Sequence, residues 1–552
     1  MLRTRRETPR SASTIRSGII VVLLAGAAAC GGDDTAGPPV TPPATTSGGT
    51  AAQPATTPAA PPSSDAPDLS QFDTEATLRG AQRFAPTQFD PHVTTNFRSD
   101  RVWQSPVYDL LLQFSRTANG LEVTGNLATG YEVSDDGLTI TFALRDDVWF
   151  TDGTKFDSAA VKANIERAQT VEGSLAAPLF ARITSIDTPD ETTAVFHLSE
   201  PDNGLLYWLA SPGPGFMVSP AAMDGDLART PVGTSAFVLD QATEAGVTYQ
   251  RRTDGHIWNP QTGLVKSIVL SAVVDDNARV NGFRAGEFDV IDVNDTTYPL
   301  ALDLEAEDLG TVHSPGPSSP LIYYFNTSRQ PFDDVRVRRA LSLAIDRAAM
   351  NEALFEGNCP PTDQLFPDGI VGHIPDLDAE YDPDEARRLL AEAGAENLEF
   401  DMMMAAVNNV TIPAEAVQQM WAEVGVTANL VPIDGGIVRS EFRSGRGDVA
   451  AILLPVEPPD PGNIAGQFIG IDNPGGNTPP ELVELVATAQ SKALVDPTRP
   501  AAFEAITNYL QENPLHIFAC AAKTGNMFSN RVVQVAPSYD FNQYGGMGIL
   551  AS

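Results

Sequence analysis

The residue types that could carry out chemistry are few in this 552-residue chain, and they are not spaced for it. Zinc sites and catalytic dyads place histidine near its partner groups at defined spacings. The segment 233–237 fails the last position of the Gly-x-Ser-x-Gly nucleophile motif, and no phosphate-binding Gly-x-x-x-x-Gly-Lys segment occurs. We therefore predict no enzyme, no metal site and no cofactor. The six histidines are scattered, at His92, His197, His256, His313, His373 and His516.

The order of elements after Tyr381 predicts where a ligand would bind instead. Asp382 is placed to cap a helix that opens at Pro383 and ends at Gly394. Strands at 398–404, 426–431 and 449–454 then alternate with helices at 413–423 and around 437–442, which predicts an α/β fold with a mainly parallel sheet. Ligands bind at the carboxyl ends of such strands. The loops 405–411, with Asn408 and Asn409, and 455–462 are therefore candidate site loops.

Earlier segments predict more elements of the same body. The alternating stretch 131–144 predicts a hairpin that turns at Asp136-Gly137. A helix is expected at 158–168, with Ser158 as its N-cap. Another is expected at 331–347, with Asp333 or Asp334 at its cap.

The first 30 residues are typical of an export signal. Five arginines precede an apolar run at 18–29, which is too short to span a bilayer permanently. Cys30 follows Ala-Ala-Ala as in a bacterial lipobox, so we expect it to be lipidated; cleavage at an ordinary Ala-x-Ala site is the alternative. Arg5-Arg6 leaves both the general secretory route and the twin-arginine route open. Residues 31–70 are rich in Pro, Thr, Gly and Ala, which predicts a disordered tether.

The remaining cysteines and the charge describe the exported body. Cys359 and Cys520 form an even pair in an oxidising compartment, where either a disulfide or two buried free thiols would fit. The formal net charge is −36, and without residues 1–30 the chain holds 30 basic and 70 acidic residues, or −40. An acidic protein of this kind is not expected to bind nucleic acid. About 480 residues are more than one core usually holds, so we expect two lobes.

Several blocks in order along the chain carry a resemblance to a known family. They include 134–168 (SDDGLTITFALRDDVWFTDGTKFDSAAVKANIERA), Phe89-Asp90-Pro91-His92, 231–234, 286–290, 325–347 (FNTSRQPFDDVRVRRALSLAIDR) and 459–461. The chain thereby resembles the family 5 extracellular solute-binding proteins of ABC importers, which include dipeptide- and oligopeptide-binding proteins. The resemblance covers roughly residues 77–544.

The resemblance implies a two-lobed fold of the type II periplasmic-binding-protein kind, a Venus flytrap with an extra subdomain in lobe one. Lobe one is expected at 72–320 and 515–552, with the subdomain at 106–227, and lobe two at 321–514. The crossings are expected near 321–325 and 515–518. A bond between Cys359 and Cys520 would then staple lobe two or the hinge.

The resemblance also implies binding residues. A carboxylate three residues before the Asp-Pro pair anchors a ligand amine in the family, and Glu457 stands there. Peptide binders usually have Asp at that position and Trp where this chain has Leu454. Asp460 precedes Pro461 and is also expected to form a turn. Thr95, Asn96 and Phe97 follow the Asp-Pro-His block, in a loop that lines the family's cleft.

The function implied is capture of a peptide or similar small amine-bearing solute by hinge closure, followed by delivery to membrane permease subunits. The protein is expected to be a monomer at the extracytoplasmic face of the cell membrane, lipid-anchored through Cys30. The alternative is a ligand-sensing lipoprotein that binds a signal peptide without import. The sequence leaves the ligand itself open.

Overall fold

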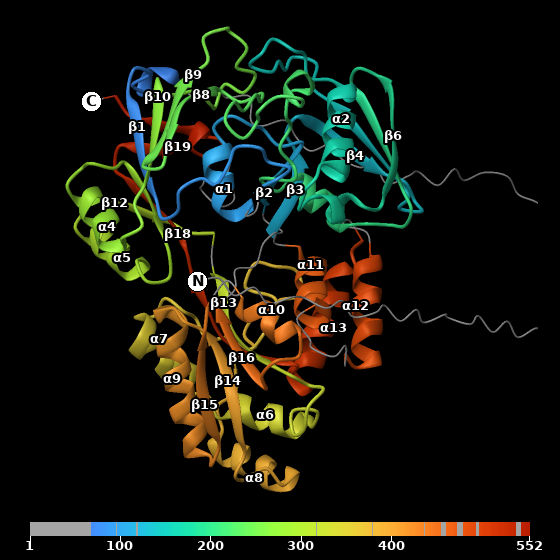
Figure 1. Ribbon diagram of the computed structural model, residues 1–552, viewed down its shortest axis with the longest axis vertical. Coiled ribbons are helices and arrows are strands. Elements are labelled where there is room, and N and C mark those ends of the chain that lie inside the picture. The colour runs from blue at the N-terminus through green and yellow to red at the C-terminus, as the bar shows by residue number, and fades with distance from the viewer. Residues whose placement is uncertain are drawn as a thin grey trace, which may run out of the picture. The chain divides into compact units, whose positions relative to one another are not determined.

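The computed structural model describes residues 68–551 except 95–96, 118–119, 316, 378, 435–436, 454–459, 472–477, 493–495 and 537–542. Its strands form a seven-stranded, a five-stranded and a four-stranded sheet together with two strand pairs, and helices lie among them (Figure 1). The fold is therefore α/β, as predicted. Among the described residues, no helix is both long and apolar enough to cross a membrane.

The seven-stranded sheet is parallel at its centre. Its order is β12-β18-β11-β1-β10-β9-β8, and β1 runs parallel to both β10 and β11. The outer pairings are antiparallel. The strands are β1 (Thr77–Gln82), β8 (Phe237–Thr243), β9 (Gly246–Arg251), β10 (Ser267–Ala272), β11 (Val290–Val293), β12 (Gly310–His313) and β18 (Gly525–Ser529).

Side chains alternate between the two faces of this sheet because successive residues of a strand point to opposite sides. Leu78 and Val290 enter one core, with Trp103 of α1 (Phe97–Gln104). Ala81 and Ile291 enter a second core, which the helices α4 (Asp276–Arg284) and α5 (Tyr298–Ala306) complete. The short alternating strands thus bury both faces.

The five-stranded sheet has the order β15-β14-β16-β13-β17. β14, β15 and β16 are parallel, as predicted from the alternating helices and strands, whereas β13 pairs antiparallel with β16 and β17. The sheet is therefore mixed. Its strands are β13 (Pro317–Phe325), β14 (Glu399–Ala405), β15 (Thr427–Ile433), β16 (Val449–Leu453) and β17 (His516–Lys523).

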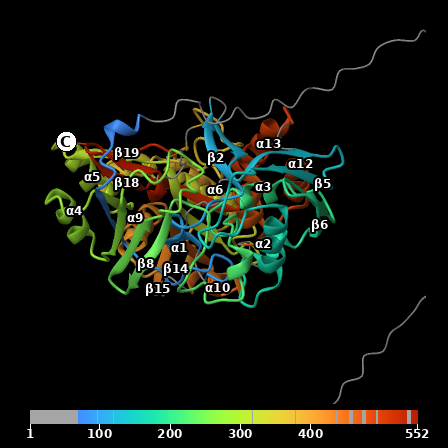
Figure 2. The same ribbon diagram turned by 90° about the horizontal axis from the view of Figure 1, so that it is seen from above.

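Helices pack against both faces of this sheet, where they contact aromatic residues of β13. Tyr323 packs at 5.6 Å against Trp421 of α9 (Asn408–Glu423), whose indole N–H donates to Leu341 of α6 (Val335–Leu343). Tyr324 points to the other side and packs against Phe442 of α10 (Val438–Arg443). The remaining helices of this body are α7 (Arg347–Phe355), α8 (Pro383–Ala393), α11 (Pro461–Ala465), α12 (Pro480–Ser491) and α13 (Arg499–Glu512). Figure 2 shows the same elements from above.

The four-stranded sheet, β4-β5-β7-β6, has a core of its own with the helices α2 (Ser158–Thr170) and α3 (Gly204–Leu209). The predicted hairpin at 131–144 is confirmed, since β4 and β5 pair antiparallel around Gly137 in the left-handed region. The prediction that Ser158 caps α2 is wrong. Asp157 is the N-cap, and its side chain accepts from the Ala160 N–H. The negative charge of this carboxylate is also stabilised by the positive end of the helix dipole. The sheet's strands are β4 (Ala128–Val133), β5 (Thr139–Leu144), β6 (Ile183–Asp190) and β7 (Thr193–Leu198), and the separate pairs are β2 (Leu112–Thr117) with β3 (Gly120–Gly125) and β19 (Val532–Gln534) with β20 (Met547–Ile549).

The expected helix at 331–347 is shorter than predicted, because α6 spans only Val335–Leu343. A separate helix, α7, begins at Arg347, where Asp346 accepts from the Ala349 N–H and caps it. Asp334 caps α6, and Asp382 caps α8 with Pro383 in its first turn, as predicted. The helix expected from 413 begins earlier, at Asn408.

Candidate functional site

The carboxyl ends of parallel strands mark one edge of each large sheet. In the seven-stranded sheet, β1, β10 and β11 end at Gln82, Ala272 and Val293. In the five-stranded sheet, β14, β15 and β16 end at 405, 433 and 453. We call the segments that follow these strands the first edge and the second edge. Loops at such ends are where α/β proteins bind ligands.

The first edge presents a cation and exposed apolar side chains. Arg83 and Phe84 directly follow β1, and the guanidinium carbon lies 5.3 Å from the centre of the Phe84 ring. Phe84 is 55% exposed, and Val274, which follows the neighbouring β10, is 70% exposed. An anionic group can bind Arg83 while an apolar group packs on Phe84.

Acidic residues lie beneath these side chains. Asp292 of β11 and Asp276 of α4 both pair with Arg279, at 3.0 and 2.5 Å, and Arg279 is fully buried. Burial raises the pKa of Asp292 to about 6, although the charges of Arg279 and Arg83 oppose the shift. The Asp292 carboxyl therefore takes up a proton on mild acidification, which makes the charge at this edge dependent on pH.

Asp295 joins the two edges. It follows β11, and the side chain of Asn409, in the first turn of α9 beyond β14, lies close enough to its carboxyl to oppose the rise of its pKa. Asp295 is 8% exposed, and its Oδ2 has no hydrogen-bond partner among the described residues. Burial raises the pKa of this carboxyl. The predicted residue Asn409 is thus placed where the two edges meet.

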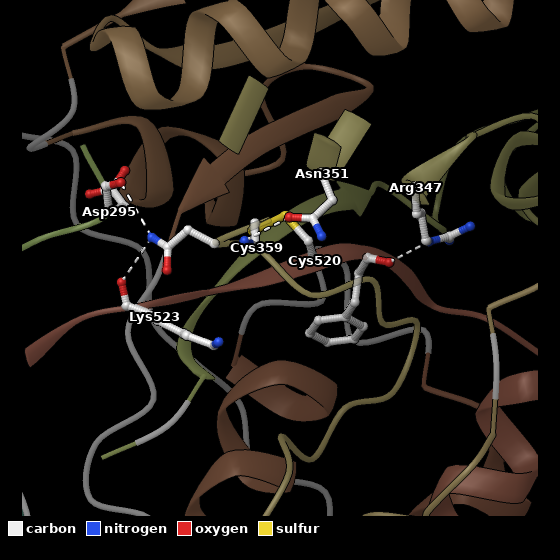
Figure 3. Close-up of a disulfide and its surroundings, with 8 residues drawn as sticks. Asp295, Arg347, Asn351, Cys359, Cys520 and Lys523 are labelled. Atoms are coloured by element: carbon white, nitrogen blue, oxygen red, sulfur yellow. Dashed lines mark hydrogen bonds between the residues drawn. A yellow bond between two sulfur atoms is a disulfide. The ribbon is translucent and has the colours of Figure 1, made fainter. Parts of the chain in front are cut away.

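Asn358 adds a second link at the same place. Its side-chain amide donates to the backbone oxygens of Asp295 and Lys523, each at 3.4 Å. Figure 3 shows these two acceptor residues near the Cys359–Cys520 disulfide. Cys359, the neighbour of Asn358, is bonded to Cys520 of β17, which confirms a disulfide in place of free thiols. Both sulfur-bearing residues lie in the core of the five-stranded sheet. The disulfide therefore holds the segment around Asn358 against β17. From there the Asn358 amide reaches Asp295 at the first edge.

Asp460, another predicted site residue, has structural partners on both oxygens. Its Oδ2 accepts from the Asn463 N–H at 2.8 Å and so caps α11, and its Oδ1 lies 3.3 Å from Arg499. Asp460 is 2% exposed, and burial raises its pKa. The expected turn before Pro461 is present as this helix cap. A contact with ligand stays a prediction.

The other predicted residues are only partly described. Phe97 begins α1 and Asn408 begins α9, while nothing is described of their side chains. Thr95, Asn96, Glu457 and Cys30 lie outside the described residues. Within the described ranges, no cluster of three or more His, Cys, Asp or Glu is arranged to hold a metal ion.

Sequence reasoning missed Arg83, Phe84 and Asp295. From the sequence, the strand-end rule predicts site loops only after Tyr381, where helices and strands alternate clearly. The same rule applied to β1 and β11 points to these three residues, because each stands one or two positions beyond a parallel strand. The missing information was which early strands pair in parallel.

Comparison with known proteins agrees with this architecture. The family model for bacterial extracellular solute-binding proteins, family 5, middle, matches residues 122–474, more than half of the chain. The glutathione-binding protein GsiB of Escherichia coli (strain K12) is 31% identical over 357 residues, covering 63% of this chain and 68% of that protein.

Solved structures show the same fold. The periplasmic binding protein DppA of Helicobacter pylori, in complex with the peptide STSA, has a TM-score of 0.72 and 20% identity, covering 87% of this chain and 99% of that chain. NikA of Brucella suis, in complex with Fe(III)-EDTA, has a TM-score of 0.75 and 22% identity, covering 86% of this chain and 100% of that chain. The expected two-lobed, type II periplasmic-binding-protein fold is confirmed.

Proposed function

Because this chain belongs to family 5 of the bacterial extracellular solute-binding proteins, we propose that it captures a peptide or similar small amine-bearing solute and delivers it to the permease of an ABC importer. Proteins of this family are binding components of transport systems and not enzymes. The absence of a catalytic motif in the sequence agrees with this assignment.

The observation that carries the proposal is the contact between Asp295 and Asn409. It brings together the carboxyl ends of parallel strands from two sheets, which is where two-lobed binders hold a ligand. We place the change of lobe between β12 and β13 and between β17 and β18, because β12 and β18 belong to one sheet and β13 and β17 to the other. These two connections form the hinge in our proposal. These positions differ from the crossings expected near 321–325 and 515–518, since β17 pairs with β13 inside the five-stranded sheet.

The ligand chemistry follows from the charges near the edges. A zwitterionic ligand needs an anion for its ammonium group and a donor for its carboxylate, since unpaired buried charges are costly. In our proposal Glu457 supplies the anion, and Arg83 supplies the donor beside the apolar surface of Phe84. A related protein is named as glutathione-binding, and a structural neighbour was solved with a peptide, so both ligand kinds are suitable probes.

Binding then shifts the equilibrium between an open and a closed form. The ligand contacts one lobe first, and its contacts with the second lobe stabilise closure. About 5 kcal/mol of differential affinity is enough to move such an equilibrium almost completely. In the same proposal the protein acts as a monomer outside the cytoplasm, and the lipid on Cys30 anchors it to the membrane.

The direct test is native mass spectrometry of the full chain for co-purified ligand, followed by titration calorimetry with glutathione and with the peptide STSA. We expect a bound small molecule with a free amine. Glu457→Ala should then lose binding of that molecule, while Glu415→Ala, an exposed glutamate of α9, should bind it normally. A protein that carries no ligand and binds neither probe contradicts the proposed function, and unchanged affinity in Glu457→Ala removes Glu457 from the site.

A further inference from the structure

Asn203 caps a helix that belongs to a different part of the fold. It stands between β7 and α3, and its side chain does not cap α3. Its Nδ2 instead donates to the backbone oxygens of Gln490 and Lys492, at 3.0 and 2.7 Å. These oxygens lie at the C-terminal end of α12, where helix carbonyls lack partners within the helix. Asn203 therefore satisfies acceptors that α12 does not satisfy itself.

The two partners are built on separate cores. The residues next to Asn203, Leu205 and Leu206, are buried with the four-stranded sheet. Leu482 and Ala489 of α12 are buried with the five-stranded sheet. The hydrogen bonds of Asn203 therefore connect two bodies that each have their own hydrophobic interior, and they form only when these bodies touch.

A second contact lies one helical turn further along α3. Tyr207 lies close enough to Arg499 and Asp460 for both to act on its pKa, and Arg499 pairs with Asp460 at 3.3 Å. Burial raises the pKa of Tyr207 to about 12, so its hydroxyl stays protonated. Between these contacts, a Cβ on Gly204 would lie 3.5 Å from Asn463 Oδ1, so α3 and α11 approach closely there. The polar contacts are thus set in a packed surface.

We propose that Asn203 and Tyr207 form a latch that sets how much of the protein is closed before any ligand arrives. The inference rests on the proposed hinge closure and adds a regulator of it. Asn203 binds backbone oxygens, so it is a positioning residue: it changes the apparent ligand affinity through the fraction of closed protein. Two hydrogen bonds of ordinary strength correspond to roughly a tenfold change in the ratio of closed to open protein.

The test compares ligand-free variants by small-angle X-ray scattering. Asn203→Ala and Asn203→Asp remove the donor, and Tyr207→Phe removes the hydroxyl. The control is Asn429→Ala, because the Asn429 amide donates to Glu399 and Asp401 within the five-stranded sheet. We expect a larger radius of gyration in the three latch variants and no change in the control. For Asn203→Ala, the ratio of open to closed protein should rise roughly tenfold.

Identical scattering of the Asn203 variants and the parent protein would overturn the latch, and so would an equal expansion of the control. Circular dichroism spectra should show that each variant is folded. Asn203 is only half-buried, so its replacement should leave the cores intact. The measurement needs no ligand. A failure of the latch is therefore distinguishable from a failure of the proposed function, which is judged from ligand binding alone.

Discussion

The guanidinium of Arg499, at the start of α13, lies 3.3 Å from the carboxylate of Asp460, at the cap of α11, and both side chains are at least 95% shielded from water. Each charge thus depends on the other, because an isolated charge in such surroundings is strongly unfavourable. In the sequence, Asp460 directly follows residues 454–459, which include Glu457.

Replacing Arg499 with Met should lower the free energy of unfolding by about 3 kcal/mol, because it leaves the Asp460 carboxylate buried without its partner. Urea denaturation at pH 7 measures this. Burial already raises the pKa of Asp460, so the deficit should shrink as the carboxyl is protonated at lower pH. The double variant Arg499→Met/Asp460→Asn should be less destabilised than Arg499→Met alone. Stability within 0.5 kcal/mol of the parent, about the range of an ordinary surface substitution, would show that the pair is not important.

His92 should make the protein sensitive to acid. It is buried, and Arg167 lies 2.8 Å from its Nδ1 while also pairing with Asp90. Burial, reinforced by the charge of Arg167, lowers the pKa of His92 to about 4. A base with a lowered pKa in the folded state contributes stability above its unfolded pKa, near 6.5, and that stability is lost as the pH falls toward 4.

His92→Gln should therefore lose less stability than the parent between pH 7 and pH 4. Between pH 7 and pH 4, the free energy of unfolding of the parent should fall by on the order of 3 kcal/mol more than that of His92→Gln. Chemical denaturation at several pH values measures it. His197→Gln is the matched control, because that imidazole is exposed and pairs with Asp187 at the surface. Equal slopes for the parent and His92→Gln would contradict the prediction.

Reduction of the Cys359–Cys520 disulfide should destabilise the body of the five-stranded sheet. The bond closes a segment of 161 residues and links the loop after α7 to β17. A cross-link that closes a long segment reduces the conformational entropy of the unfolded chain. Such a cross-link raises the free energy of unfolding by about 2 to 5 kcal/mol in favourable cases. The double variant Cys359→Ser/Cys520→Ser should show this loss in urea denaturation. The parent protein treated with a reductant under denaturing conditions and refolded should match it, and an unchanged midpoint would contradict the prediction.

Much of the fold was predictable because its determinants are local. The Asp382 cap, the Gly394 terminus and the Asp136-Gly137 turn each depend on one or two residues, and the structure has all three. The break between α6 and α7 was not predictable from apolar spacing, because Asp346 had to be chosen as a cap over a continuing helix. The choice depends on tertiary packing, since both helices contact β17.

The candidate site was less predictable, because it depends on which strands are neighbours. Asn409 was found from the order of helices and strands alone. Its partner Asp295 was not, since nothing local to Asp295 shows that β11 lies beside β1 in parallel. Arg83 was missed for the same reason. Contacts across more than 100 residues require the sheet order, which a single sequence does not provide.

Arg83 offers the sharpest test of ligand chemistry at the first edge. Arg83→Ala should weaken binding of a carboxylate-bearing ligand about tenfold or more, because a charge-assisted hydrogen bond contributes roughly 1.5 to 3 kcal/mol. Titration with glutathione and with the peptide STSA measures the change, using whichever probe binds the parent protein. Arg229→Ala is the control, because Arg229 is exposed and pairs only locally with Asp226. Arg83→Lys should restore part of the affinity, since it keeps the charge but not the planar donor geometry. Equal affinities of Arg83→Ala and Arg229→Ala would place the ligand carboxylate elsewhere. The free energy of unfolding should stay within about 0.5 kcal/mol of the parent in Arg229→Ala. It should fall in Arg83→Ala, because Arg83 offsets the charges of Asp276, Asp292 and Asp295.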